Sequence, residues 1–220
     1  MNVDEVISLL KQKSNASYLA GMKRFGIENT KALGIPIPEL RKLARIIKTD
    51  HALALNLWET GLHEARMLAS MVDDPALVSS AQVNCWVNDF NSWDICDQVC
   101  GNLFDRAPFA IEKAVAFSAH EKEFIKRAGF VLMAEYAVHN KTAKDETFTN
   151  LLPLIEREAW DDRNFVKKAV NWALRQIGKR NNTLKIAAIE TANRILLQES
   201  RSAKWIASNA IGELTKKTIS

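Results

Sequence analysis

The stretch at residues 165–178 reads FVKKAVNWALRQIG. Its apolar residues recur every three or four positions, which is the spacing of an amphipathic α-helix with one buried face. Two other segments begin with an aromatic residue and continue as a helix rich in small residues: FIKRAGFVLMAEYA at 124–137 and WIASNAIGELTKK at 205–217. The segments at 124 and 165 begin 41 residues apart, a period typical of paired helices that stack because no single pair buries its own apolar face. The repetition predicts HEAT-like repeats, and a plain irregular helical bundle is the alternative.

Helical spacing continues through most of the chain, and no convincing alternating strand interrupts it. Only eight glycines and five prolines occur in the 220 residues, and breaks divide the chain into about a dozen helices. The breaks fall near Gly34–Pro38, Asp73–Pro75, Asn88–Ser92, Arg106–Pro108, His139–Thr142, Pro153, Asp161–Arg163 and Lys179–Asn182. We therefore expect an all-α fold, a HEAT-like repeat α-solenoid with a concave basic groove, formed by a single domain over residues 1–220.

The composition is that of a soluble globular protein, with 47% hydrophobic residues and no run approaching the roughly 18 apolar residues of a membrane span. The N-terminus, MNVDEVISLLKQK, lacks the basic start and apolar core of a secretion signal, so we expect a cytoplasmic protein. The three cysteines, Cys85, Cys96 and Cys100, do not suggest a disulfide framework, and we expect them to be reduced and buried. A net charge of +4 permits nucleic acid as a partner without requiring it.

The segment at residues 91–100, NSWDICDQVC, combines a tryptophan and two carboxylates in a helix that faces the core. At about 100° per residue, its apolar face consists of Ile95, Cys96, Val99, Cys100 and Leu103. The other face consists of Asp94, Gln98, Gly101 and Asp105. Trp93, Asp97 and Phe104 fall on the border between the two faces. This spacing places a carboxylate beside an indole at the rim of the core.

Each member of this segment also has an ordinary structural interpretation. An acid at position 94 favours the positive end of the helix dipole and can form a cap with Asn91, so we expect Asp94 to point toward water or toward the helix N-terminus. Asp97 can be a rim carboxylate paired with a nearby arginine, and Trp93 alone can be a packing residue.

Residues 165–178 provide a second candidate surface. Trp172 lies at the margin of the apolar face, next to Lys168, Arg175 and Lys179. An aromatic ring beside three cations suits a sugar–phosphate chain, because the ring contacts sugar or base and the cations contact phosphate. The alternative is a solvated charged face with a core tryptophan.

The segment at 124–137 is apolar on nearly every side, so we expect it to be buried. Arg127 lies in its first turn, where the helix dipole disfavours a cation and where burial requires a partner anion. The anion could be Asp97 or the phosphate of a ligand. Arg66, in the similar stretch LHEARMLAS, is a second candidate by the same reasoning.

The sequence has no motif for a metal or a nucleotide cofactor. His63 and Glu64 do not belong to an HExxH motif, and Cys96 and Cys100 have no second pair of ligands at zinc-site spacing. There is no GxGxxG, Walker or GxSxG motif. We therefore expect no metal and no cofactor.

Taken together, five segments resemble the AlkD-like DNA alkylation repair family of HEAT-repeat DNA glycosylases, in the same order and over nearly the whole chain. They are LGIPIPELRKLAR at 33–45, LHEARMLAS at 62–70, NSWDICDQV at 91–99, FIKRAGFVLMAEYA at 124–137 and FVKKAVNWALRQIGK at 165–179. The WDxxD element and the later WALR helix are the most specific of these. The family removes alkylated purines such as N3-methyladenine and N7-methylguanine from DNA, without a metal or a nucleotide cofactor.

The resemblance implies roles for individual residues. Asp97 corresponds to the family's catalytic aspartate, and Trp93 and Trp172 correspond to the two indoles that contact the deoxyribose of the lesion. Arg127 corresponds to a basic residue that contacts the DNA backbone. The further residues that we expect to bind DNA are Arg66, Lys168, Arg175 and Lys179. The implied reaction is hydrolysis of the N-glycosidic bond while the damaged base stays stacked in the duplex.

The expected partner is double-stranded DNA with alkylated bases, and we expect a monomer that does not associate with membranes. One departure from the family concerns a tyrosine that commonly lies a few residues before the LGI element. The nearest equivalent here is Gly21 in LAGMKRFG, followed by a longer connection. Two rival functions stay open: a catalytically silent member that binds distorted or branched DNA, and a HEAT-type scaffold for protein interactions.

Overall fold

The computed structural model describes residues 1–27 and 30–216, which contain fourteen α-helices, two 3-10 helices and no strand. Helix accounts for 72% of these described residues, so the predicted all-α class is confirmed. Lys217, the last residue of the predicted segment at 205–217, lies outside the described residues. Contacts divide the chain into two compact units, Met1–Pro108 and Phe109–Ser220.

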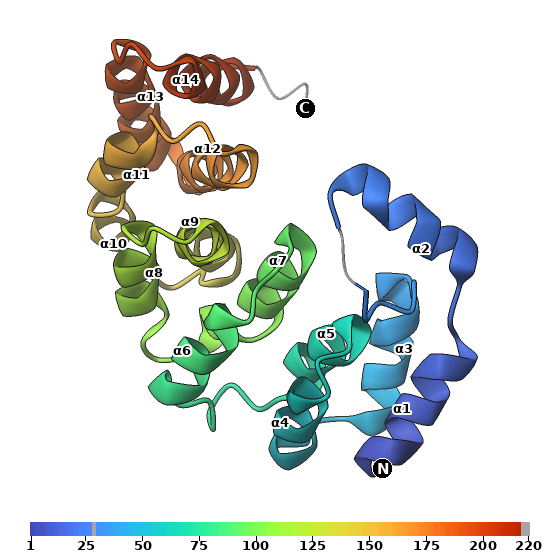
Figure 1. Ribbon diagram of the computed structural model, residues 1–220. Helices are drawn as coiled ribbons and strands as arrows, with labels where there is room; N and C mark the ends of the chain where they lie inside the picture. Colours follow the sequence, from blue (N-terminus) through green and yellow to red (C-terminus); the bar gives the residue numbers. More distant parts are fainter. Residues whose placement is uncertain (28–29, 217–220) are drawn as a thin grey trace. The chain divides into compact units, whose positions relative to one another are not determined.

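The first unit is built from short helices, shown in blue to green in Figure 1. Its helix α5 packs against α3, α4 and α7 and so forms the centre of the unit. The elements are α1 (Val3–Gln12), α2 (Ala16–Met22), η1 (Lys23–Phe25), α3 (Ile37–Ile47), α4 (His51–Glu59), α5 (His63–Val72), α6 (Ser80–Asn88), α7 (Trp93–Asn102) and η2 (Phe104–Arg106).

Aromatic side chains fill the core between α4 and α6. The indoles of Trp58 and Trp86 stack with their ring centroids 4.0 Å apart and their planes 2° apart. Phe90 and Phe104 pack beside them, with centroids 6.3 Å from Trp58 and 6.1 Å from Trp86, respectively. Burial of such large rings dominates the stability of a core, so this cluster contributes strongly to the stability of the first unit.

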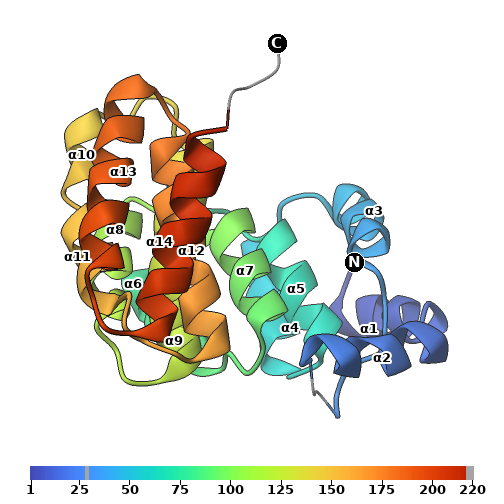
Figure 2. The ribbon, with the colours of Figure 1, turned by 90° about the horizontal axis from the view of Figure 1, so that it is seen from above.

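The second unit consists of helix pairs arranged in two layers (Figures 1 and 2). Helix α8 pairs with α9, α11 with α12, and α13 with α14, while α9, α12 and α14 form one layer in which α12 contacts both neighbours. The elements are α8 (Ala110–Ser118), α9 (Glu123–His139), α10 (Asp145–Thr149), α11 (Leu152–Glu158), α12 (Asn164–Gly178), α13 (Asn182–Leu196) and α14 (Arg201–Leu214). The three segments that looked alike in sequence therefore belong to one layer of this unit.

Helix α9 is buried on nearly all sides, as the sequence predicted. It lies so close to α8 that a Cβ atom at Gly129 would be 2.5 Å from the backbone nitrogen of Ser118 and 2.9 Å from the carbonyl oxygen of Ala114. Glycine is therefore required where the two backbones approach.

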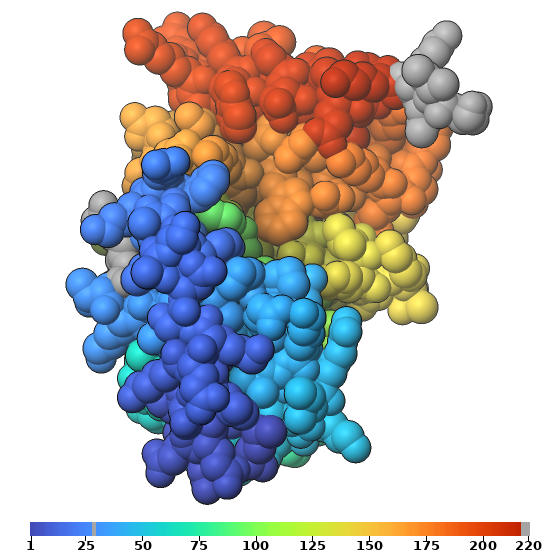
Figure 3. Space-filling model, turned by 90° about the vertical axis from the view of Figure 1, so that its right-hand side faces the viewer, coloured from blue at the N-terminus to red at the C-terminus, as the bar shows by residue number. Residues whose placement is uncertain are grey.

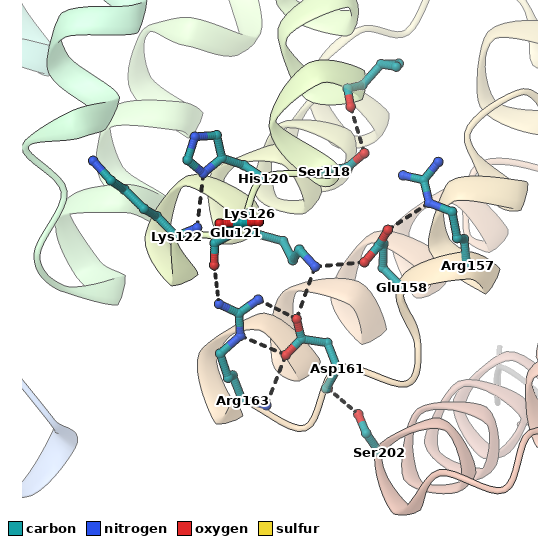
Figure 4. A network of polar contacts seen from close by, with 11 residues as sticks. Ser118, His120, Glu121, Lys122, Lys126, Arg157, Glu158, Asp161, Arg163 and Ser202 are labelled. Atoms are coloured by element: carbon teal, nitrogen blue, oxygen red, sulfur yellow. Dashed lines mark hydrogen bonds and ion pairs between the residues drawn. The ribbon is translucent and has the colours of Figure 1, made fainter.

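A network of charged side chains joins α9, α14 and the turn between α11 and α12 (Figure 4). The ammonium of Lys126 is 2.8 Å from Glu158 and 3.2 Å from Asp161. Arg163 donates to the carboxylate of Asp161, and the hydroxyl of Ser202 donates to the carbonyl oxygen of Asp161 at 2.7 Å. Burial raises the pKa of Asp161, but the hydrogen bonds from Arg163 and Lys126 outweigh it and lower the pKa. The ionised carboxylate of Asp161 thus links the turn to α9, and its carbonyl oxygen links the turn to α14.

Candidate functional site

Helix α7 carries the first candidate residues, Trp93 and Asp97. Its predicted apolar face is confirmed, because the five residues assigned to that face are fully buried: Ile95, Cys96, Val99, Cys100 and Leu103. Trp93 and Asp97 are half-buried at the border of this face, one helical turn apart. The fold therefore holds a carboxylate and an indole side by side at the rim of the core, within reach of solvent.

The predicted positions of Phe104 and Asp105 are wrong. Both residues are buried, whereas the helical spacing had placed Phe104 on the border and Asp105 on the solvent face. The reason is that α7 ends at Asn102 and a 3-10 helix follows, so the 100° spacing does not extend to these residues. The predicted α7 border is thus reduced to Trp93 and Asp97.

Asp94 does not point into water. Its carboxylate is 2.8 Å from Nε2 of His63, whose side chain is buried on α5. Burial raises the pKa of Asp94, but the hydrogen bond and the charge of His63 outweigh it, and the pKa lies below its ordinary value of 3.8. The residue does lie in the first turn of α7, as predicted. The spacing of residues within one helix could not predict this partner, because His63 and Asp94 come from different helices.

The indole of Trp93 is held by a hydrogen bond from its Nε1 to the carbonyl oxygen of Phe25, at 2.9 Å. Phe25 belongs to the 3-10 helix that follows α2. This hydrogen bond orients the ring through its polar edge and does not involve the ring faces. The segment that contains Gly21 and Phe25 is therefore part of the surroundings of Trp93.

Arg127 lies in the second unit, on α9. Because α9 begins at Glu123 and not at Phe124, this residue is one residue further from the helix start than the sequence predicted, just beyond the first turn. The side chain is only 5% exposed, and its Nη1 donates to the carbonyl oxygen of Phe165 on α12 at 2.6 Å. This contact anchors the guanidinium against the first turn of α12. The expected anionic partner, Asp97 or a ligand phosphate, stays a prediction.

Helix α12 carries the second candidate surface in a single stripe, which consists of Lys168, Trp172, Arg175 and Lys179. Trp172 is half-buried, as predicted for a residue at the margin of the apolar face, and Lys168 and Lys179 are exposed. We call these four residues the α12 stripe.

Glu213 on α14 changes the charge of the α12 stripe. It forms ion pairs with both Arg175 and Lys179. The hydrogen bond from Lys179 lowers the pKa of Glu213, burial raises it, and the hydrogen bond from Arg175 lowers it again, so that the pKa lies below its ordinary value. This residue was not identified from the sequence. When the similar segments that begin at Phe165 and Trp205 are aligned, Glu213 corresponds to Ala173, which is next to Trp172 of the stripe.

A family model described as "DNA alkylation repair enzyme" matches residues 6–214 of the chain. The chain belongs to this DNA alkylation repair family. One solved structure is similar to this chain, with 17% sequence identity and a TM-score of 0.80. The match covers 97% of this chain and 95% of the other chain. That structure is described as "A new family of proteins related to the HEAT-like repeat DNA glycosylases with affinity for branched DNA structures". No curated protein sequence matches the chain significantly.

The resemblance to the HEAT-repeat members of the DNA alkylation repair family is thus confirmed, and so is the HEAT-like fold. The family's LGI element is fixed by a buried carboxylate, Glu64, which accepts backbone hydrogen bonds from Leu33, Gly34 and Ile35 at 2.8, 2.7 and 3.2 Å. Gly34 has a φ of +75°, and a Cβ there would be 2.4 Å from the carbonyl oxygen of Asn15. This contact requires glycine before α3.

Gly21, where family members commonly have tyrosine, lies near the end of α2. A Cβ atom built on it would meet nothing within 4 Å. The space for a side chain is therefore present. The longer connection predicted between Gly21 and the LGI element includes residues 28 and 29, which lie outside the described residues.

Arg66 has partners inside the first unit. Its guanidinium is 2.9 Å from the carboxylate of Asp89 and 4.9 Å from the centre of the Trp58 ring. These contacts tie α5 to α4 and to the end of α6. A role for Arg66 in binding DNA stays a prediction.

In the part of the chain that the structure describes, no group of three or more histidine, cysteine, aspartate or glutamate residues is placed to hold a metal ion. None of the described helices is long and apolar enough to cross a membrane. Cys85, Cys96 and Cys100 form no disulfide; Cys96 and Cys100 are buried as predicted, whereas Cys85 is exposed because it lies on the outer face of α6.

Proposed function

We propose that this member of the DNA alkylation repair family is a monofunctional DNA glycosylase of base excision repair. It would hydrolyse the N-glycosidic bond of cationic alkylated purines, N3-methyladenine and N7-methylguanine, in duplex DNA. The observation that carries the proposal is the half-buried pair Trp93 and Asp97 on α7, in a chain that belongs to the DNA alkylation repair family. A carboxylate in this position is partly shielded from water, which strengthens its electrostatic effect, and it is still exposed enough to contact a substrate.

The proposed reaction needs no catalytic group that acts on the base. Alkylation of a ring nitrogen makes the purine a cation, so the base leaves as a neutral molecule with the electron pair of the glycosidic bond and needs no general acid. Positive charge then develops on the deoxyribose. An ionised Asp97 stabilises this charge electrostatically, and it positions the water that adds to the sugar carbon. The water loses a proton, and an abasic site remains.

The aromatic and basic residues would position the DNA. Trp93 and Trp172 contact the deoxyribose through their ring faces, which attract the developing cation. Arg127 and the cations of the α12 stripe bind flanking phosphates, which set the register of the duplex without reading its sequence. A mechanism directed at the sugar leaves the base in the stack, so that base flipping is not required, in contrast to most base-removing enzymes.

A catalytically silent protein that binds branched DNA is the second candidate. The observation that favours it is the affinity for branched DNA ascribed to the structural relative, which shares the fold at 17% identity. Such a protein would use the basic residues but not Asp97. A scaffold for protein interactions would tolerate loss of the cations as well. For all three, we propose a monomer in the cytoplasm.

Base release separates these functions. Purified protein is incubated with randomly methylated duplex DNA, and free N7-methylguanine and N3-methyladenine are measured by chromatography. We expect release by the wild-type protein and none above background by Asp97→Asn, while duplex affinity stays within a few-fold, because the change removes a charge and keeps the shape. No release by the wild type would favour the silent DNA-binding protein. Release by Asp97→Asn at the wild-type rate would show that Asp97 is not catalytic.

A further inference from the structure

The N-terminal parts of α12 and α14 carry four cations that have no carboxylate partner within the described residues. They are Lys167 and Lys168 on α12, and Arg201 and Lys204 on α14. Neither helix has an acidic residue in its first turn. The helix dipole disfavours cations at this end, so the arrangement is unfavourable for the protein alone and would be stabilised by an anionic ligand.

The register between α12 and α14 brings one of these lysines to an indole. The side-chain amide of Asn171 donates to the carbonyl oxygen of Ile206 at 3.1 Å. One turn before Asn171, the ammonium of Lys167 lies 5.2 Å from the centre of the Trp205 ring. Arg201 and Lys204 precede Trp205 by four residues and one residue, so Arg201 and Trp205 share one side of α14 and Lys204 lies close to it. We call Lys167, Arg201, Lys204 and Trp205 the α14 face.

Trp205 is accessible, with 42% of its surface exposed. Farther along the same side of the helix, Ser208 and Gly212 are also exposed, and a Cβ at Gly212 would meet nothing within 4 Å. A ligand backbone can therefore approach α14 closely. Figure 3 shows the second unit from a side on which α12, in orange, and α14, in red, are open to view.

Trp160 provides an internal comparison. It is also exposed, at 58%, and the ammonium of Lys126 lies 5.6 Å from its ring. However, Lys126 is paired with both Glu158 and Asp161 (Figure 4). The cation beside Trp160 is neutralised, whereas the cations beside Trp205 are not. Charge therefore distinguishes two otherwise similar tryptophans.

We propose that the α14 face binds a single-stranded segment of DNA. The indole of Trp205 stacks on an unpaired base, and Lys167, Arg201 and Lys204 contact the neighbouring phosphates. Every base has a flat face, so stacking tolerates any sequence, but it requires a base that is free of its pairing partner. The inference rests on the proposed function in one respect, that DNA is the ligand, and it adds a contact for unpaired arms to the contacts proposed for the duplex.

The test compares an oligothymidylate with a blunt duplex of mixed sequence, both fluorescein-labelled, by fluorescence anisotropy. We expect Trp205→Ala to weaken binding of the oligothymidylate about tenfold and binding of the duplex much less. Trp160→Ala is the matched control and should leave both affinities unchanged. Thermal melting of each variant checks the fold, and Trp205→Phe, which keeps an aromatic ring, should restore most of the affinity.

The cations are tested through the salt dependence. Replacing Lys167 and Lys204 together by glutamine should reduce the slope of log affinity against log salt for the oligothymidylate by about 1.4, since each phosphate contact on a single strand contributes about 0.7. The matched control replaces Lys11 and Lys144, two exposed lysines outside the α14 face, and should leave the slope unchanged.

Several outcomes would overturn the inference. Equal losses for duplex and single strand in Trp205→Ala would indicate a backbone contact without stacking, and an equal loss in Trp160→Ala would indicate nonspecific binding. Stronger binding of polyglutamate than of the oligothymidylate would assign the face to acidic proteins. The proposed function fails separately: a wild type that releases no methylated base but binds the oligothymidylate through Trp205 contradicts only the glycosylase activity.

Discussion

At the scale of single residues, the two carboxylates of α7 differ in what surrounds them. Asp94 is paired with the buried His63 at 2.8 Å, and Asp97 is half-buried at the border of the helix. A paired carboxylate fixes structure, because loss of one partner leaves the other buried without compensation. By holding α7 to α5, the pair His63–Asp94 fixes the helix on which Trp93 and Asp97 are presented.

Asp94→Asn should therefore destabilise the fold by about 2 kcal/mol at neutral pH. Because the pKa of Asp94 is lowered in the folded state, its ionised form contributes stability above its ordinary value of 3.8, and this contribution is lost as the pH falls through the lower folded pKa. In urea unfolding, the difference between wild type and variant should stay constant near neutral pH and should shrink as the pH falls below about 5 and through the folded pKa. The exposed Asp162→Asn is the control. A difference that does not change with pH would contradict the assignment.

Glu213→Gln should strengthen binding of duplex DNA. The carboxylate pairs with Arg175 and Lys179, so its removal leaves two cations of the α12 stripe available to phosphates. The slope of log affinity against log salt should steepen by about 1 to 2. Glu156→Gln is the matched control, because Glu156 is equally exposed at 30% and pairs with Arg194. Weaker binding by Glu213→Gln would place the duplex on another surface.

At the scale of elements, the packing of α9 on α8 depends on one glycine. Gly129→Ala should destabilise the protein by about 2 kcal/mol or more, since the added methyl group meets the backbone of Ser118 and must push the helices apart. Gly212→Ala, also within a helix but in open space, should stabilise it by about 0.5 to 1 kcal/mol. Thermal unfolding of both variants measures the contrast. If Gly129→Ala does not destabilise the protein relative to Gly212→Ala, the close approach of α9 to α8 is contradicted.

At the scale of the whole molecule, the proposed mechanism selects lesions by charge more than by size. It supplies no general acid for a neutral base and imposes no pocket wall on the base, so bulky cationic adducts should be tolerated. Duplexes of one sequence with N7-methylguanine, a larger N7-alkylguanine, N3-methyladenine, hypoxanthine or uracil are followed for abasic-site formation, corrected for spontaneous depurination. We expect excision of both guanine adducts and none of hypoxanthine or uracil. Efficient release of uracil would require a base-reading pocket.

Local sequence determined the helices and their buried faces. The spacing of apolar residues predicted the burial of α9 and the core-facing side of α7, and it placed Trp93, Asp97 and Trp172 at margins that the structure confirms as half-buried. These features follow from hydrogen bonds and side-chain spacing within a single helix. The prediction failed at Phe104, where the helix had already ended.

The tertiary structure alone decided which charges meet. His63 reaches Asp94 over 31 residues of sequence, and Arg175 reaches Glu213 over 38. The same holds for Lys167, which lies beside Trp205 because Asn171 fixes α12 against α14. Spacing within one helix says which side a residue faces, but its partner depends on the register between helices, and that register is set by packing of side chains far apart in the sequence.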